Sequence, residues 1–185
     1  MVIVNSEKVE YALTNTDLNK FLPDVKIYTY EELADTQNLK ELLPDRRCAI
    51  IILAEQMPNI GHWVCIVKVE RSYIFFDSYG QRPDKTINWT DKQLRRCLNQ
   101  DYPHVSFLLN KCLDDGFKVV YSGFAYQNKN NCKIATCGRW IIVFITYMLK
   151  TSKATLNSFY DMIKKNCNAY QLNPDYLVTF LTNDV

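Results

Sequence analysis

The feature that most constrains the fold is a long apolar segment that follows a polar loop. Between Arg139 and Lys150 the chain carries no charge, and this length and composition are typical of a helix buried on most sides. The loop before the segment is rich in Asn and Lys and ends at Thr136-Cys137-Gly138. Thr136 is a suitable N-cap, so we expect Cys137 in the first helical turn. The amide donors and the partial positive charge of a helix N-terminus favour a thiolate over a thiol.

A block of strands in the middle of the chain is the second constraint. Residues 48–54 form a continuous apolar run rich in β-branched side chains, which is typical of a central strand buried on both faces. Residues 62–69 and 72–76 predict two further strands joined by a tight turn at residues 70–71. Residues 117–126 predict another strand, because they are rich in valine and aromatic side chains.

Helical patterns lie on both sides of this block. We expect helices at residues 30–43, 156–167 and 175–181, and another that Thr90 or Asp91 opens and that runs to Gln100. We also expect a short helical turn capped by Thr16 at residues 18–22 and one more strand at residues 105–109. The order of helices, then strands, then helices predicts a single α+β domain over residues 1–185.

Composition and targeting signals exclude several classes of protein. Apolar residues make up 48% of the chain, which is typical of a globular protein and not of a disordered one. The net charge of +2 is too small to predict nucleic acid as the main partner. The first residues lack the basic start and apolar core of a signal peptide, and the apolar run after Trp140 is too short to span a bilayer. We therefore expect a soluble protein without a membrane partner.

The cysteines bear on redox state and on metal binding. The chain has seven cysteines, an odd number, and they form no CxxC motif, so we expect mostly free thiols in a reducing compartment. Cys132 and Cys137 lie close together in sequence, but no second pair of Cys or His residues lies at the spacing of zinc ligands. We therefore expect neither a metal nor an organic cofactor.

One of the two histidines lies where a carboxylate can orient it. With the hairpin turn at residues 70–71, His62 falls opposite Tyr79, and Asp77 lies two residues away on the same face of the neighbouring strand. A carboxylate in that position holds the imidazole in one tautomer and stabilises the imidazolium formed when the ring accepts a proton. The alternative interpretation is a half-exposed histidine beside an aspartate in a turn.

Cys137 and His62 together predict nucleophilic catalysis. A thiol at a helix start and an imidazole that takes its proton form an ion pair with a nucleophilic sulfur. Acyl transfer also needs donors for the developing oxyanion. The backbone amide of Cys137 supplies one, and the side chain of Gln127 is our candidate for a second. Three nearby residues are alternatives to Gln127, namely Asn128, Asn130 and Asn131. Cys132 is the alternative nucleophile.

Four short motifs together resemble the adenovirus-type cysteine proteases. In chain order they are Gly61-His62-Trp63, Phe76-Asp77-Ser78-Tyr79-Gly80, Tyr126-Gln127 and Thr136-Cys137-Gly138-Arg139-Trp140. This family also includes the SUMO-specific proteases and the capsid-maturation proteases of large DNA viruses, virophages and related mobile elements. The order His, Asp, Gln, Cys is that of the clan. One departure is the interval from Gln127 to Cys137, which is longer than the family's usual one.

The resemblance implies an adenain-like fold, in which helices flank a central mixed β-sheet and the nucleophile begins a buried central helix. It implies a nucleophile, a base, an orienting carboxylate and an oxyanion donor, namely Cys137, His62, Asp77 and Gln127. Trp63 and Gly138 are the implied substrate-binding residues.

These observations predict a cysteine endopeptidase that works through a thioester acyl-enzyme. The resemblance implies capsid precursors as substrates, small residues such as Gly at the cleavage site, and a location in the virion and in the host cytoplasm or virus factory. By analogy alone it also implies DNA or a viral peptide as an activator, and a basic cluster at Lys92, Arg95 and Arg96 is the candidate DNA contact. Two alternatives are an isopeptidase that removes ubiquitin or a ubiquitin-like modifier from host proteins, and a catalytically silent binding module.

Overall fold

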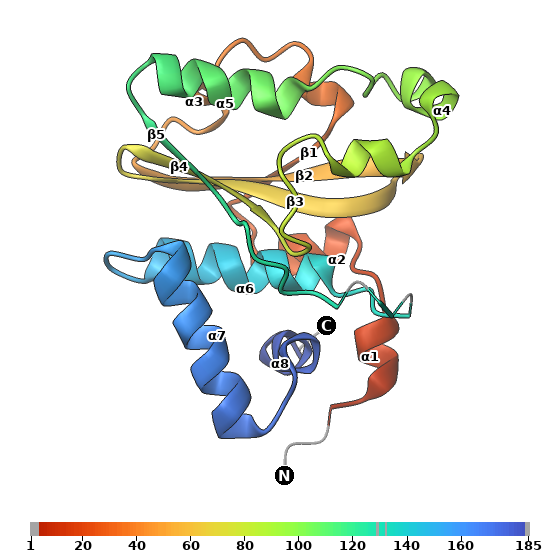
Figure 1. Cartoon of the computed structure of the whole chain (residues 1–185), viewed down its shortest axis with the longest axis vertical. Coiled ribbons are helices and arrows are strands. Elements are labelled where there is room, and N and C mark those ends of the chain that lie inside the picture. The colour runs from red at the N-terminus through yellow and green to blue at the C-terminus, as the bar shows by residue number, and fades with distance from the viewer. Residues whose placement is uncertain (1–3, 129, 132, 184–185) are drawn as a thin grey trace.

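The computed structural model describes residues 4–128, 130–131 and 133–183, and a five-stranded sheet lies at its centre (Figure 1). The strands, in sheet order, are β1 (Lys26–Thr29), β2 (Arg47–Met57), β3 (Ile60–Val69), β4 (Ser72–Asp77) and β5 (Lys118–Tyr121). The three central strands are antiparallel, whereas β1 and β5 each run parallel to their neighbour. The chain is therefore an α+β protein with a mixed sheet.

The two hairpins of the central strands carry His62 and Asp77. In the β3–β4 hairpin Val69 pairs with Ser72, which is the predicted register. In the β2–β3 hairpin Ala54 pairs with His62. Gly61 is required there, because a Cβ atom at this position would lie 2.0 Å from the carbonyl oxygen of Ala54. This close approach brings His62 to the end of the sheet.

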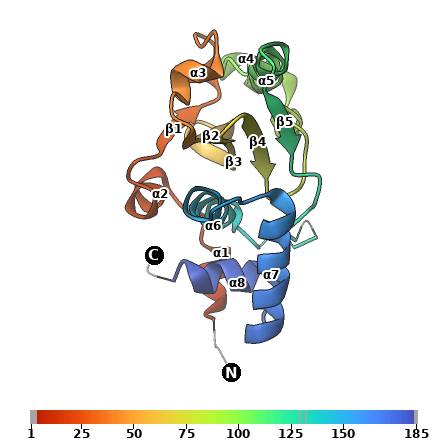
Figure 2. The same cartoon turned by 90° about the vertical axis from the view of Figure 1, so that its left-hand side faces the viewer.

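Helices cover both faces of the sheet (Figures 1 and 2). The helices are α1 (Ser6–Glu10), α2 (Asn15–Phe21), α3 (Leu39–Leu42), α4 (Lys92–Cys97), α5 (His104–Asp114), α6 (Cys137–Lys150), α7 (Leu156–Tyr170) and α8 (Pro174–Leu181), with 3₁₀ turns η1 (Glu31–Leu33) and η2 (Thr86–Trp89). Helices α3 and α5 lie on one side of the sheet and α2 and α6 on the other, with α1, α7 and α8 beyond α6 (Figure 1). Within the part of the chain that the structure describes, no helix combines the length and apolar character needed to cross a bilayer.

Successive side chains of β2, β3 and β4 point to opposite faces of the sheet, and this alternation divides the buried side chains between two cores. On β3, Trp63 and Cys65 belong to the core shared with α6, whereas Val64 and Ile66 belong to the core on the opposite face. Because the central strands are apolar on both faces, each face can bury a helical layer. The apolar helix that the sequence predicts is α6, and it packs on the sheet through Phe144.

The expected strand at residues 105–109 was wrong, because this segment lies inside helix α5. Its buried side chains are Val105, Leu108, Leu109 and Cys112. These positions recur at intervals of three and four residues, which is the helical period. A window of five residues was too short to distinguish this period from that of a strand.

The expected helix at residues 30–43 is interrupted. The segment forms the 3₁₀ turn η1 and then the short helix α3, because Asn38 is extended and its side chain accepts a hydrogen bond from the backbone N–H of Lys40. An Asn side chain that caps a new helix in this way ends the one before it.

Three other boundaries also differ from the sequence expectation. Helix α2 is capped by Thr14 and not by Thr16, since Thr14 forms a capping box with Asp17. Helix α4 begins after Asp91 as expected but ends at Cys97. Strand β5 ends at Tyr121, well before Tyr126.

Candidate active site

Cys137 is the first residue of α6, as the sequence predicts. Thr136 precedes it at the N-cap position, but its side chain does not cap the helix. Its hydroxyl donates instead to Oδ1 of Asp175, at 2.5 Å. The side chain of Thr136 therefore leaves the first turn of α6 uncapped, beside Cys137, which is partly exposed as a residue.

His62 and Asp77 form the predicted pair. Nε2 of His62 lies 3.1 Å from Oδ1 of Asp77, and both side chains are buried. The same carboxylate oxygen accepts a hydrogen bond from the backbone N–H of Tyr79, at 2.7 Å. The backbone of Asp77 is held by Ser122, whose hydroxyl accepts from its N–H at 2.9 Å. These hydrogen bonds hold the Asp77 carboxylate in the position from which it orients the imidazole.

The Cys137 thiol lies close enough to the His62 imidazole for each group to shift the pKa of the other. Asp77 occupies Nε2 of the ring, which leaves Nδ1 as the ring nitrogen that can take the thiol proton. Burial raises the pKa of the Cys137 thiol, but the His62 contact and the backbone N–H groups of Trp63 and Gly138 outweigh it and lower that pKa below its ordinary value. Burial likewise lowers the pKa of His62, yet the contacts with Asp77 and Cys137 raise it overall. Both shifts favour a thiolate–imidazolium pair.

The two halves of this pair come from opposite sides of the sheet. By alternation His62 shares the face of Val64 and Ile66, whereas α6 packs against the other face. They meet at the end of the sheet, where β3 begins and α6 starts. This meeting could not be derived from the strand register alone.

Two aromatic rings pack against the imidazole. The ring centroids of Tyr79 and Trp89 lie 5.0 and 5.3 Å from that of His62. Trp89 lies in the 3₁₀ turn η2 and is about half exposed. Sequence analysis missed it, because no pattern in that loop indicates which way its side chain points.

Gln127 is buried in the loop that leads to α6. Its Oε1 accepts from the hydroxyl of Ser78 at 2.9 Å, and its Nε2 donates to the carbonyl oxygen of Ile134 at 3.2 Å. The alternative donors Asn128, Asn130 and Asn131 are exposed. Among the described residues, no hydrogen bond joins the Gln127 amide to the Cys137 sulfur. Cys132, the alternative nucleophile, lies outside the described residues.

A cavity of about 370 Å³ adjoins Cys137. Its lining comes from the start of α2 and the segment before it, from β2, β3 and the turn between them, and from the start of α6, namely Ala12, Leu13, Thr14, Asn15, Thr16, Leu53, Asn59, Ile60, Gly61, Trp63 and Cys137. Trp63 is therefore part of the wall, and its Nε1 donates to the carbonyl oxygen of Leu13 at 3.0 Å. Gly138 is buried beneath Leu13, where a Cβ atom would lie 3.0 Å from the Leu13 Cβ. Sequence analysis did not predict that the N-terminal segment forms this wall.

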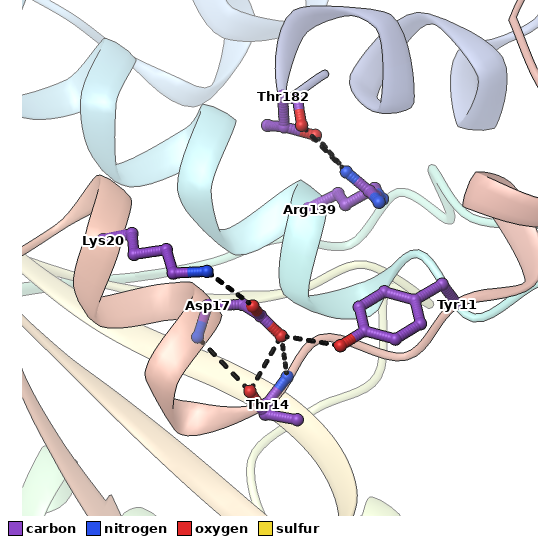
Figure 3. Close-up of polar contacts among 6 residues, drawn as sticks. All are labelled: Tyr11, Thr14, Asp17, Lys20, Arg139 and Thr182. Carbon is purple, nitrogen blue, oxygen red and sulfur yellow. Dashed lines mark hydrogen bonds and ion pairs between the residues drawn. The ribbon is translucent and has the colours of Figure 1, made fainter. Parts of the chain in front are cut away.

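Polar contacts hold the N-terminal wall in place (Figure 3). Oδ2 of Asp17 accepts from the backbone N–H and the hydroxyl of Thr14, at 3.0 and 2.7 Å, and from the hydroxyl of Tyr11, at 3.1 Å. Lys20 lies 3.5 Å from the other carboxylate oxygen. The wall is therefore bound to the first turn of α2.

Arg139, two residues after Cys137, anchors α6 to α8 (Figure 3). Its guanidinium is fully buried and donates to the backbone oxygen and the hydroxyl of Thr182, at 3.0 and 2.8 Å. Burial lowers the pKa of Arg139, although Asp17 and Tyr11 act in the opposite direction. These hydrogen bonds fix α6 to α8 on the side of α6 that faces away from the sheet.

Two comparisons with known proteins bear on the origin of this arrangement. No protein-family model matches the chain. The chain is 34% identical to the uncharacterized protein V9 of Sputnik virophage, over 179 residues that cover 95% of each chain. The chain belongs to the same family as the V9 protein of Sputnik virophage.

Proposed function

We propose that this protein is a cysteine endopeptidase with an adenain-like fold. The observation that carries the proposal is the buried relay from Asp77 through His62 to Cys137, at the N-terminus of α6 and beside a cavity. A thiol whose pKa is lowered by an oriented imidazole is the arrangement that nucleophilic acyl transfer needs.

The first half of the reaction is acylation. The Cys137 thiolate attacks the carbonyl carbon of the scissile peptide, and the oxyanion that develops is bound by the Cys137 backbone amide and the Gln127 side chain. The His62 imidazolium then gives its proton to the leaving amine while Asp77 stabilises its charge. The peptide bond breaks and a thioester to Cys137 remains.

The second half is deacylation. Water takes the place of the departed amine, His62 accepts its proton, and the hydroxide attacks the thioester carbonyl. The same oxyanion donors act again, and the thiolate is the leaving group. No metal or organic cofactor takes part in this scheme.

The substrates in this proposal are viral structural precursors with small residues such as Gly at the cleavage site. Membership in a family with a virophage protein supports a viral role. The proposed locations are the virion and the cytoplasm or virus factory of the host. DNA or a viral peptide as an activator rests on analogy alone. On α4, Arg95 and Arg96 both pair with Asp101, which reduces the charge that this helix offers to DNA.

The test is digestion of candidate capsid precursors by the wild type and by Cys137→Ala, with the cut sites mapped by mass spectrometry. We expect cleavage by the wild type and none by Cys137→Ala. A peptide that carries a thiol-reactive electrophile should label the wild type and Cys132→Ala but not Cys137→Ala.

Two outcomes would contradict this proposal. Cleavage of a ubiquitin-like conjugate with every precursor left intact would indicate the isopeptidase. No labelling and no cleavage of either substrate would indicate a binding module.

A further inference from the structure

A buried carboxylate outside the catalytic relay links the two segments that carry the oxyanion donors. Asp175 lies in the first turn of α8 and is 3% exposed. Its Oδ1 accepts from the Thr136 hydroxyl at 2.5 Å and from Nε1 of Trp140 at 3.0 Å. Its Oδ2 accepts from the backbone N–H of Asn128 at 3.0 Å. A buried charge with three donors is well compensated and holds those donors firmly.

The partners of Asp175 are placed at the two ends of one loop. Asn128 directly follows Gln127, and Thr136 directly precedes Cys137. The carboxylate therefore fixes the distance between the residue that carries the side-chain amide and the residue that carries the backbone amide. At the far side of Gln127, the Ser78 hydroxyl holds Oε1 and so determines which way the amide nitrogen points.

We propose that Asp175 is a positioning residue for the oxyanion site, which it assembles from α8. The inference rests on the proposed protease function. It also gives a physical account of the long interval between Gln127 and Cys137: a longer loop has more conformational freedom, and Asp175 removes that freedom by binding both of its ends. Donors held in advance cost no reorganisation when the charge develops.

The experiment compares two buried threonines that contact Asp175 in different ways. Thr136→Val removes the hydroxyl that binds the Asp175 carboxylate, whereas Thr179→Val removes a hydroxyl that binds only the backbone oxygen of Asp175, at 2.8 Å. Asp175→Asn tests the carboxylate itself. Three quantities are measured for each full-length variant: kcat on a cleaved peptide, affinity for a peptide aldehyde of the same sequence, and the rate at which iodoacetamide alkylates Cys137.

The aldehyde and the alkylating agent separate the two parts of the site. An aldehyde forms a tetrahedral adduct whose oxygen occupies the oxyanion site, whereas alkylation needs only the thiolate. For Thr136→Val and Asp175→Asn we expect kcat and aldehyde affinity to fall about 10- to 100-fold. The alkylation rate, read by mass spectrometry of the Cys137 peptide, should stay within about twofold. Thr179→Val should leave all three quantities near the wild-type values.

Three results would overturn the inference. An equal fall in alkylation would show that Asp175 supports the thiolate or the fold as a whole. Unchanged kcat and aldehyde affinity in an active enzyme would show that Asp175 does not position the donors, and the protease function would stand without it. A wild type that neither cleaves the peptide nor binds the aldehyde would remove the proposed function and this inference together.

Discussion

At the scale of single residues, ionisation of Cys137 and His62 is governed by burial and by the pair's own contacts. Burial opposes charge on both groups, yet the pKa of the thiol is lowered and that of the imidazole is raised. The contact with His62, aided by the backbone N–H groups at the sulfur, lowers the pKa of the thiol, and the contacts with Asp77 and Cys137 raise the pKa of the imidazole. Both shifts favour the charged pair over the neutral one.

For the proposed protease, the pH dependence of kcat/KM should accordingly be a bell, with its acid limb below the ordinary thiol pKa and its alkaline limb above the ordinary imidazole pKa. Activity is lost as pH falls through the lowered pKa of Cys137, because the thiol is protonated. It is lost again as pH rises through the raised pKa of His62, because no proton remains for the leaving amine. Asp77→Asn removes a cause of the raised His62 pKa, so the alkaline limb should move to lower pH and kcat should fall by about 10²- to 10⁴-fold.

The matched control for that substitution is Asp161→Asn, at an exposed position of α7. Its profile of kcat/KM against pH should overlay that of the wild type. An alkaline limb that stays in place in Asp77→Asn would contradict the role given to this carboxylate.

The substitution Gly138→Ala tests the contact between α6 and the cavity wall. A Cβ there would lie 3.0 Å from the Leu13 Cβ and 3.3 Å from Cδ1 of Trp63. Crowding of this kind costs about 1–3 kcal/mol, and the gain in helix propensity offsets only about 1 kcal/mol. We expect Gly138→Ala to lower the free energy of unfolding in urea. Gly123→Ala is the control, since a Cβ there meets nothing within 4 Å; equal effects would refute the crowding.

At the scale of elements, the start of α2 and the start of α6 both line the cavity. Thr14 and Asp17 form a capping box, and Asp17 also accepts from Tyr11. These bonds tie the segment that forms the cavity wall to a helix N-terminus, where a carboxylate is also favoured by the helix dipole.

Asp17→Ala should therefore destabilise the protein by about 1–3 kcal/mol, through the lost cap and the donors left unpaired. The free energy of unfolding in urea measures this. Asp24→Ala, at an exposed position after α2, should change stability by less than about 0.5 kcal/mol. If the two variants lose the same stability, the capping box does not hold the wall.

At the scale of the whole molecule, one aromatic side chain links three layers. Phe144 of α6 stacks on Phe76 of the sheet, with ring centroids 4.0 Å apart, and meets Phe159 of α7 edge-on at 5.0 Å. The apolar core is continuous from the sheet through α6 to the outer helices. Unfolding of one layer therefore exposes the next.

We expect Phe144→Ala to cost about 3–5 kcal/mol, with unfolding that remains a single transition. Urea titrations followed by circular dichroism and by tryptophan fluorescence should coincide. Phe107→Ala, at a partly exposed position of α5, is the control and should cost much less. Two separated transitions in the wild type would show that the layers unfold independently.

Features that depend on residues close together in the sequence could be predicted, and features that depend on contacts between distant segments could not. The hairpin that brings His62 beside Asp77 could be predicted, because a tight turn and two-residue alternation determine its register. The residues 105–109 were misassigned because a short window does not resolve the helical period. Trp89 and the N-terminal wall went unpredicted because they depend on how loops pack.

The sequence alone determined the strand block, the His62–Asp77 register and a buried helix that begins at Cys137, since each follows from periodicity and turn chemistry over a few residues. Only the tertiary structure decided that Cys137 meets His62 from the opposite side of the sheet and that Asp175 joins the two ends of the loop before α6. Local rules extend over one helical turn or across one hairpin. Contacts between residues far apart in the chain exist only once both cores have packed.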